Sequence, residues 1–293
     1  MNPLPMQVFA AFAWGALVTP LSISLSRRFR VLDIPGDRKI HSGVVPRGAG
    51  IVLWLGYLLW VLLFSWSIPG TRVAAIGGTL VFLAGYVDDM RQTSPFFRLA
   101  FHVSAAVLVS LTLPLSPLGK ALVAFWITGC TNAYNLIDGM DGLCLSLVVS
   151  AACCFSLFGG MSLWMPLAGL CCGVLVWNFP LPRAKTFLGD GGSTLLGFLC
   201  ASQIATSLSH GFPDPLRMVP VLALLGGMPV FDTVVAVGRR LLVGRSPFLP
   251  DRGHIHHRLL DRSFPVTAII VTMGAMHVAL TLSGLALLNF YRG

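Results

Sequence analysis

The sequence predicts an all-α, polytopic integral membrane protein with about ten transmembrane helices. Its mean hydropathy is +0.81, 55% of its residues are apolar and only 11% are charged, far from the composition of a soluble globular protein. A helix needs roughly 20 apolar residues to cross a bilayer. The chain offers about ten such stretches, centred on residues 6–25, 48–66, 72–88, 98–113, 119–134, 143–160, 162–179, 191–209, 215–237 and 266–290.

The distribution of cations predicts the orientation of these helices. If ten helices alternate, sixteen of the 20 Lys and Arg residues fall in loops on one side. Such residues accumulate in cytoplasmic loops, so we expect both termini outside and the long segments 27–47 and 238–265 in the cytoplasm. The net charge of +9 then reflects topology and the binding of anionic phosphates and lipid head groups. Nucleic acid is not an expected partner, because no soluble basic domain is visible.

One membrane domain over residues 1–293 is the simplest organisation, because the sequence shows no internal repeat and no low-complexity linker. The opening Met-Asn-Pro-Leu-Pro lacks the basic region of a signal peptide, so the first helix is expected to be retained. The seven cysteines lie within or beside predicted spans without metal-binding spacing, which favours a structural role.

The acidic residues are unusual, because all eleven are Asp and ten of them fall on the predicted cytoplasmic side. Short Asp side chains suit a hard cation and phosphates. Asp88 and Asp89 close a predicted helix shortly before Arg98. Adjacent carboxylates repel each other, and a bound cation would offset that cost. The alternative is a solvated acidic pair beside an Arg.

A ladder of polar residues follows the fifth predicted span. Asn132, Asn135, Asp138 and Asp141 are spaced three apart, so in a helix they would share one narrow face. That face is costly against lipid and should meet a cavity, a ligand or protein; an interhelical polar network is the alternative. Asp190 stands before Gly-Gly-Ser and an apolar helix, where it would gather backbone donors or simply cap the helix.

A basic, Gly-rich segment contains Lys39 and His41 ahead of the second span. Glycines at a helix start let backbone N–H groups approach a phosphate, although a positive-inside loop with a Pro-Gly turn would look similar. Asp232, near the end of the ninth predicted span, needs a partner, and Arg239 or Arg240 could supply it without any ligand.

A second basic segment, 246–257, contains one Arg and three His residues: Arg252, His254, His256 and His257. A zinc site is imaginable, but the segment has no thiolate and no Glu. A cationic phosphate clamp fits better, because Arg offers bidentate contacts and imidazoles add donors near neutral pH. A plain basic connector is the remaining alternative.

These segments, taken in order, resemble the polyprenyl-phosphate N-acetylhexosamine-1-phosphate transferases, of glycosyltransferase 4 type. The resemblance runs from about residue 33 to residue 258. The closing His-Ile-His-His is similar to the glycan-initiating, WecA-like branch rather than to the peptidoglycan, MraY-like branch. The motifs are Arg38-Lys-x-His41 with Pro46-Arg-Gly, Asp88-Asp89, Asn132-x-x-Asn135-x-x-Asp138-Gly-x-Asp141-Gly, Gly189-Asp190-x-Gly-Ser193 and Pro250-Asp-Arg-x-His254-Ile-His-His257.

The resemblance implies a phosphoglycosyltransferase whose lipid phosphate oxygen attacks the β-phosphorus of a UDP-N-acetylamino sugar such as UDP-GlcNAc. The products would be polyprenyl-diphosphate-sugar and UMP, the first membrane step of a cell-envelope glycan such as O-antigen. Its implied partners are undecaprenyl phosphate, the UDP-sugar and the bilayer, and a homodimer is left open. Its implied location is the bacterial inner membrane, with the active site on the cytoplasmic face.

The resemblance also implies roles for individual residues. Asn135 and Asp190 would hold Mg²⁺, with Mn²⁺ as the alternative. Asp88 or Asp89 would orient or deprotonate the lipid phosphate, Arg98 would lie beside the diphosphate, and Asp138 and Asp141 would serve the nucleotide. The implied substrate-binding residues are Lys39, His41, Asn132, Asn178, Arg252, His254, His256 and His257.

A transporter or flippase for an anionic lipid is the competing class, since it too needs intramembrane polar groups and basic loops. It predicts repeats and polar residues near the bilayer midplane, whereas the motifs here cluster at cytoplasmic ends. A CDP-alcohol phosphotransferase would need an Asp-Gly-x-x-Ala-Arg pattern, and Asp138-Gly-Met-Asp does not continue that way.

Overall fold

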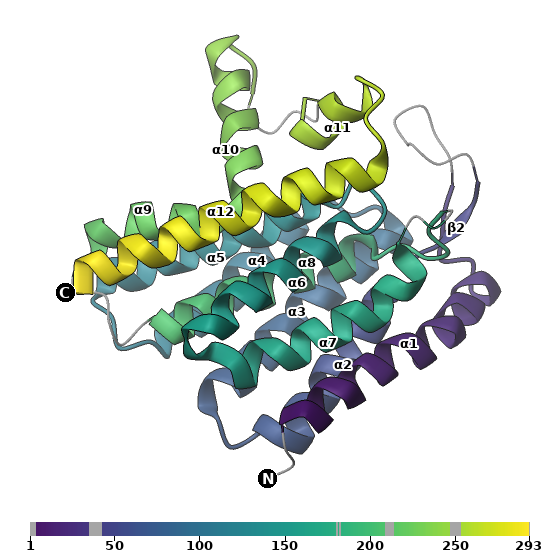
Figure 1. Ribbon diagram of the computed structural model, residues 1–293, viewed down its shortest axis with the longest axis horizontal. Helices are drawn as coiled ribbons and strands as arrows, with labels where there is room; N and C mark the ends of the chain where they lie inside the picture. The colour runs from purple at the N-terminus through teal and green to yellow at the C-terminus, as the bar shows by residue number, and fades with distance from the viewer. Residues whose placement is uncertain are drawn as a thin grey trace.

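The computed structural model of the chain is a bundle of helices, most of which run roughly side by side (Figure 1). It describes residues 4–34, 43–179, 181, 183–208, 214–246 and 253–292. In chain order the elements are α1 (Leu4–Arg28), β1 (Leu32–Asp33), β2 (Val45–Pro46), α2 (Ala49–Trp60), η1 (Val61–Ser65), α3 (Pro69–Arg91), α4 (Pro95–Leu111), α5 (Pro117–Ile137), α6 (Leu143–Phe155), η2 (Ser156–Gly160), α7 (Met161–Asn178), α8 (Gly189–Leu208), α9 (Pro215–Leu225), α10 (Gly227–Leu242), α11 (Ile255–Leu260) and α12 (Val266–Arg292).

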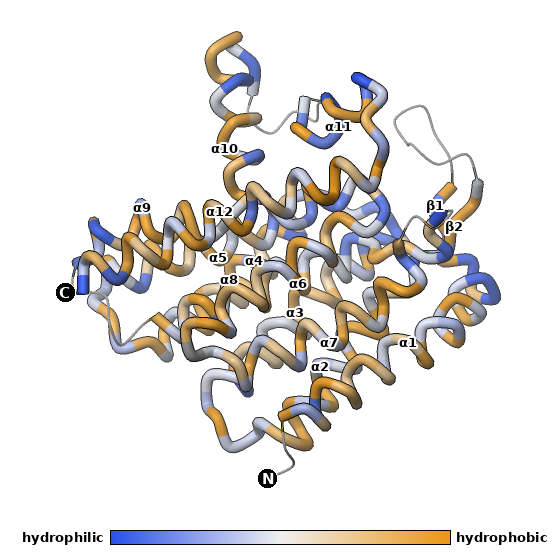
Figure 2. Tube along the Cα trace, viewed as in Figure 1, coloured by the Kyte–Doolittle hydropathy of each residue, from blue (hydrophilic) through white to orange (hydrophobic). Residues whose placement is uncertain are grey.

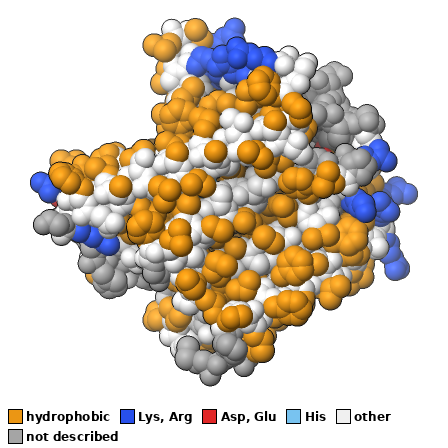
Figure 3. Space-filling view, viewed as in Figure 1, with side chains coloured by type: hydrophobic (Ala, Val, Ile, Leu, Met, Phe, Trp, Pro, Cys, Tyr) orange, Lys and Arg blue, Asp and Glu red, His pale blue; other side chains and the backbone are white. Residues whose placement is uncertain are grey.

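The predicted helical, membrane-spanning character is confirmed. Within the described ranges, α1, α3, α7 and α12 are each long and apolar enough to cross a membrane, and α9 with α10 gives up to five spans. All ten apolar stretches coincide with helices, but the predicted number of ten spans is not confirmed. Hydrophobic residues run along the helices in Figure 2, while hydrophilic residues gather around β1, β2, α11 and the end of α1. Hydrophobic side chains also cover the middle of the face in Figure 3, with Lys and Arg at its edges.

Local sequence explains where several helices begin. Ser94 and Ser116 precede Pro95 and Pro117, and their hydroxyls accept hydrogen bonds from the amides of Phe97 and Gly119 at 3.2 Å. A Ser or Asp cap followed by Pro at the first helical position is a favourable start, because Pro has no N–H to leave unpaired. Asp214 caps α9 in the same way.

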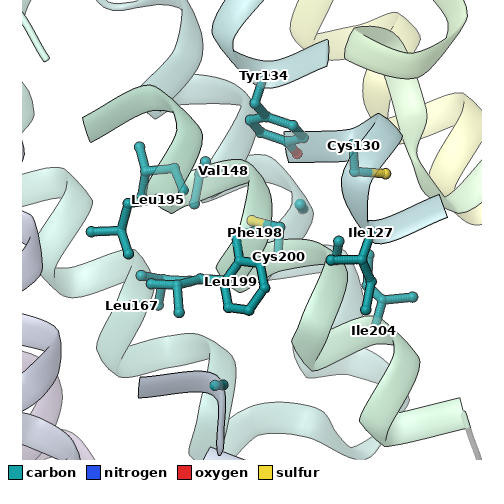
Figure 4. Packing of buried hydrophobic residues seen from close by; sticks show 14 of the residues in the cluster. Ile127, Cys130, Tyr134, Val148, Leu167, Leu195, Phe198, Leu199, Cys200 and Ile204 are labelled. Atoms are coloured by element: carbon teal, nitrogen blue, oxygen red, sulfur yellow. The ribbon is translucent and has the colours of Figure 1, made fainter. Parts of the chain in front are cut away.

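Helix α8 forms the centre of the bundle. Every residue from Gly191 to Ala205 is buried, and α8 contacts α2, α3, α4, α5 and α6. Its many small residues let neighbouring backbones approach closely, as is common where membrane helices pack. In Figure 4, Leu195, Phe198 and Leu199 of α8 lie among side chains of α5, α6 and α7. The central helix therefore fixes Asp190, which stands in its first turn.

Helices α1 and α7 pack with their backbones nearly touching. A Cβ atom on Gly15 would lie 2.6 Å from the Leu170 carbonyl oxygen, and one on Gly169 would lie 2.6 Å from that of Val8. A Cβ on Gly173 would overlap the Phe12 carbonyl oxygen. Close approach through small residues maximises van der Waals contact where lipid removes the hydrophobic driving force.

The ninth predicted span is not one straight helix. Between α9 and α10 the chain turns by 101°, so that α10, which packs on α5 and α12, projects from the bundle at the top of Figure 1. Gly227 adopts φ +61°, and the Met228 amide donates a hydrogen bond to Nδ1 of His277 on α12 at 3.0 Å. Because a side chain at position 227 would overlap the His277 ring, glycine and histidine together fix the bend.

The predicted orientation can be tested by cysteine labelling. Gly43 has no atom within 4 Å of where a Cβ would stand, and Ser67 is exposed between η1 and α3. In a variant without the native cysteines, a membrane-impermeant maleimide should label Gly43→Cys only after permeabilisation and Ser67→Cys in intact cells. The expectation follows from the excess of Lys and Arg around residue 43. Labelling of Gly43→Cys in intact cells would contradict a cytoplasmic hairpin.

Candidate active site

A cavity of about 1070 Å³ opens where the polar sequence segments meet. Its walls come from the β1–β2 hairpin, the turn after α5, the end of α7, the approach to α8 and one His of α11. The polar residues that line it include Asp33, Arg47, Asn135, Asp138, Asp141, Asn178, Asp190 and His257. Residues separated by more than two hundred positions in the sequence therefore line the same cavity.

Asp89 is the structural anchor of this region. Its side chain is 2% exposed, and it accepts hydrogen bonds from the amides of Asp190 at 2.9 Å and Gly191 at 3.1 Å. It also accepts one from Arg47 Nη1 at 3.0 Å. A carboxylate against the first amides of a helix is favoured by their unpaired N–H groups and by the helix dipole. Gly189 permits the approach, since a Cβ there would overlap the Asp89 carboxylate.

Arg47 links the hairpin to this anchor. Besides Asp89, its guanidinium pairs with Asp33, which is buried in β1. The antiparallel pairing of Asp33 with Val45 brings the two ends of the hairpin together. The hairpin is thus held to α3 by one Arg between two carboxylates, an arrangement suited to the planar fork of Arg.

Asp88 has a different environment from its neighbour. One carboxylate oxygen accepts from the Thr93 amide at 2.6 Å and from the Thr93 hydroxyl at 2.7 Å, and the other lies 3.1 Å from Arg98 Nη1. The same Nη1 pairs with Asp190. Arg98 therefore lies between two carboxylates. The two adjacent acids have different contacts, because Asp89 faces α8 and Asp88 faces Arg98.

Asn135 and Asp190 lie in direct contact. Nδ2 of Asn135 donates to Asp190 Oδ1 at 3.1 Å and to the Ser193 hydroxyl at 3.0 Å. The Asp190 side chain is 33% exposed, so its carboxylate faces the cavity while it is held by Arg98 and Asn135. Within the described ranges, no three His, Cys or acidic residues are grouped as metal ligands; an amide oxygen such as that of Asn135 would complete an oxygen donor set.

The polar ladder is only partly helical, which corrects the expected single face. Helix α5 ends at Ile137, so Asn132 and Asn135 share its last turns, while Asp138 ends the helix and Asp141 lies in the following turn. Asn132 donates to the Thr128 carbonyl of its own helix at 2.8 Å. Burial raises the pKa of Asp138 well above its usual range, and the nearby charges of Asp190 and Asp89 add to the shift.

Asp141 and Asn178 connect two segments that line the cavity. The Ala184 amide donates to Asp141 Oδ2 at 3.1 Å. Asn178 accepts from the Gly142 amide at 3.1 Å and donates to the Thr186 carbonyl at 2.8 Å. Both side chains border the cavity and tie the turn after α5 to the segment before α8.

The His-rich segment is placed beside the same turn. His256 is fully buried, and neither ring nitrogen has a hydrogen-bond partner among the described residues. Its ring packs on Gly139, where a Cβ would lie 2.6 Å from Nε2. Burial lowers the pKa of His256 to about 3, and the charge of His257 contributes. His256 is therefore a neutral packing group here, and His257 is the member that lines the cavity.

Asp232 has a partner beyond the nearby Arg239 and Arg240 that the sequence offered. Its carboxylate lies 2.7 Å from His254 Nδ1 and accepts from the Ile255 amide at 2.8 Å, so the partner is His254 and not only the nearby Arg residues. Arg47 and Ser193 belong to the motifs that carry the resemblance, but neither was assigned an individual role from the sequence. Lys39, His41 and Arg252 lie outside the described residues, so their expected roles stay predictions.

The chain is similar to a defined group of proteins. Residues 71–208, which run from the first turn of α3 to the end of α8 and contain the acids from Asp88 to Asp190, match glycosyl transferase family 4. A probable undecaprenyl-phosphate N-acetylglucosaminyl 1-phosphate transferase of Bacillus subtilis (strain 168) is 31% identical over 83% of this chain and 74% of its own.

Two further relatives extend the comparison. A decaprenyl-phosphate N-acetylglucosaminephosphotransferase of Mycolicibacterium smegmatis is 32% identical over 81% of this chain and 70% of its own. An undecaprenyl-phosphate alpha-N-acetylglucosaminyl 1-phosphate transferase of Escherichia coli (strain K12) is 29% identical over 93% and 81%.

Proposed function

The chain belongs to glycosyl transferase family 4, and from this premise we propose that it transfers N-acetylglucosamine 1-phosphate, or a related N-acetylhexosamine 1-phosphate, from a UDP-sugar to undecaprenyl phosphate. A phosphate oxygen of the lipid forms a bond to the β-phosphorus of the donor. The bond from that phosphorus to the oxygen bridging the two phosphates breaks, and UMP leaves with that oxygen. The product would begin a cell-envelope glycan at the inner membrane.

The observation that carries this proposal is the cluster of Asp88, Arg98, Asn135 and Asp190 at the first turn of α8. Phosphoryl transfer needs aligned reactants and neutralised oxygens more than covalent help from the protein. Arg98 offers a guanidinium for phosphate oxygens, and Thr93 holds the Asp88 carboxylate in one orientation. These contacts support our assignment of Asp88 to orienting the lipid phosphate or accepting its proton.

The donor set at Asn135 and Asp190 fits Mg²⁺, because carboxylate and amide oxygens are the hard ligands that this ion takes. When bound there, the ion would neutralise the diphosphate oxygens. Ser193 and Arg98 hold these two side chains from either side. Asp138, Asp141, Asn178 and His257 line another part of the cavity, which we assign to the nucleotide.

The transporter alternative is less well supported. It requires polar groups near the bilayer midplane, whereas the polar contacts around Asp190 and Asn178 lie at the ends of α3, α5 and α7 and at the starts of α4 and α8. A large apolar cluster fills the interior of the bundle, and polar side chains such as His102 and Gln203 are buried beside it.

The proposal is tested with purified protein, undecaprenyl phosphate, Mg²⁺ and a panel of UDP-sugars. We expect release of UMP, not UDP, that requires the lipid and stops when EDTA removes the metal ion. UDP-GlcNAc and UDP-GalNAc should be compared with UDP-glucose to identify the sugar. Folded protein that releases no UMP with any donor, or that releases UDP, would exclude this reaction.

A further inference from the structure

Asp232 is a buried carboxylate to which the proposed reaction assigns no direct role. It lies on α10, is 1% exposed, and uses both oxygens on α11, one for His254 Nδ1 and one for the Ile255 amide. Arg239, two turns further along α10, donates to the Gly253 carbonyl at 2.6 Å. Three consecutive residues, 253 to 255, are therefore held by α10.

These contacts depend on the bend between α9 and α10. Because the bend is fixed by Gly227 and His277, α10 has one direction relative to α12. A straight continuation of α9 would carry Asp232 in another direction. The position of α11 is therefore set by a helix that leaves the bundle, and the link between them is polar and directional.

The far side of α11 meets the cavity. Ile255, Leu259 and Leu260 pack on the apolar cluster that contains Ile137 and Met140, on either side of the Asp138–Gly139 turn. The ring of the buried His256 lies between two others: it is stacked with that of His254 at a centroid distance of 5.9 Å and tilted against that of His257 at 4.2 Å. A displacement of His254 would therefore pass through these rings to His257, which lines the cavity.

We propose that Asp232 is a positioning residue, which through His254 and the first turn of α11 sets the place of His257 beside the donor nucleotide. The inference rests on the proposed function for its kinetic readout. A carboxylate suits the task, because it accepts from Nδ1 of His254 and so fixes which ring nitrogen carries the proton. In Asp232→Asn only one side-chain oxygen remains to accept from His254 Nδ1 or from the Ile255 amide, and the NH₂ group faces whichever of these donors is left.

The test compares Asp232→Asn with Asp261→Asn. Asp261 follows α11, is exposed, and makes no hydrogen bond or ion pair with its side chain among the described residues. Asp232→Asn should raise the KM for the UDP-sugar about tenfold or more, by analogy with the loss of a group that orients a metal-binding histidine. The KM for undecaprenyl phosphate should stay within about twofold, and Asp261→Asn should match the wild type.

A double variant separates positioning from general damage. If Asp232 acts through His254, the variant Asp232→Asn/His254→Ala should be no worse than His254→Ala alone, since coupled residues give non-additive effects. Multiplied losses, an unchanged donor KM, or equal increases in both KM values with a lowered melting temperature would overturn the proposal.

Hydrogen exchange keeps this test independent of the reaction. The α11 amides of residues 255–260 should exchange faster in Asp232→Asn than in the wild type, and at the wild-type rate in Asp261→Asn, because local opening lowers protection. If the wild-type protein is inactive but the exchange pattern is as expected, the proposed function is wrong and the positioning of α11 by Asp232 stands. If the wild-type protein is active but Asp232→Asn does not change the exchange of α11, the proposed function stands and the positioning of α11 by Asp232 is wrong.

Discussion

Asp190→Asn should reduce the rate of UMP release at least about 10²-fold, as is typical when one preorganised electrostatic group is lost from an active site. The substitution keeps the shape of the side chain and removes the charge that faces Arg98. It also replaces one carboxylate oxygen with an NH₂ group, beside the Asn135 donor. Both the proposed cation site and the partner of Arg98 are weakened by one change.

The measurement is kcat over a range of Mg²⁺ concentrations. Asp214→Asn is the matched control, because Asp214 caps α9 through the Leu216 amide at 3.0 Å and Asn caps a helix as well as Asp does. The control should keep its rate and its Mg²⁺ dependence. If Asp190→Asn turns over near the wild-type rate at limiting Mg²⁺, the Asp190 carboxylate serves only to hold Arg98 and Asn135 in place.

Asp89→Asn should destabilise the protein by about 2 kcal/mol or more, since hydrogen bonds to a charged group contribute roughly 1.5–3 kcal/mol and a lost partner leaves buried donors unpaired. Asn provides one oxygen where the carboxylate serves two amides of α8 and Arg47. The first turn of α8 would loosen, and activity would fall with stability.

The adjacent Asp88 provides the comparison. Its side chain is 14% exposed and is held by Thr93, just after the end of its own helix, so Asp88→Asn should cost less stability while still lowering turnover. Thermal unfolding in detergent and UMP release, measured on both variants, separate the two effects. A larger loss of melting temperature in Asp88→Asn than in Asp89→Asn would contradict the division of roles between these neighbours.

Much of the architecture could be predicted from hydropathy, because each apolar stretch became a helix. The bend before α10 could not be predicted in this way. Residues on both sides of Gly226 are apolar, and hydropathy does not show the angle at which one helix follows another. The break of the polar ladder after Ile137 had a signal in the two glycines at 139 and 142, which disfavour a continued helix.

Some parts of the site could be predicted better than others. The rare Asp residues identified the region, where Arg98 joins Asp88 to Asp190 and Asn135 contacts Asp190. Spacing alone could not tell Asp89 from Asp88, because their difference lies in what α8 and Thr93 present to each. The pairing of Asp232 with His254 was also hidden, since it depends on the direction of α10.

The close contact of α1 with α7 bears on how this sequence can drift over evolutionary time. At Gly15, Gly169 and Gly173 any side chain meets the opposing main chain, so even alanine is expected to be selected against there. The outer face of α1 is not restricted in this way, because only 22% of the apolar, span-length stretch of this helix is buried. Homologous chains should therefore exchange one bulky apolar residue for another along α1 while keeping small residues at these three positions.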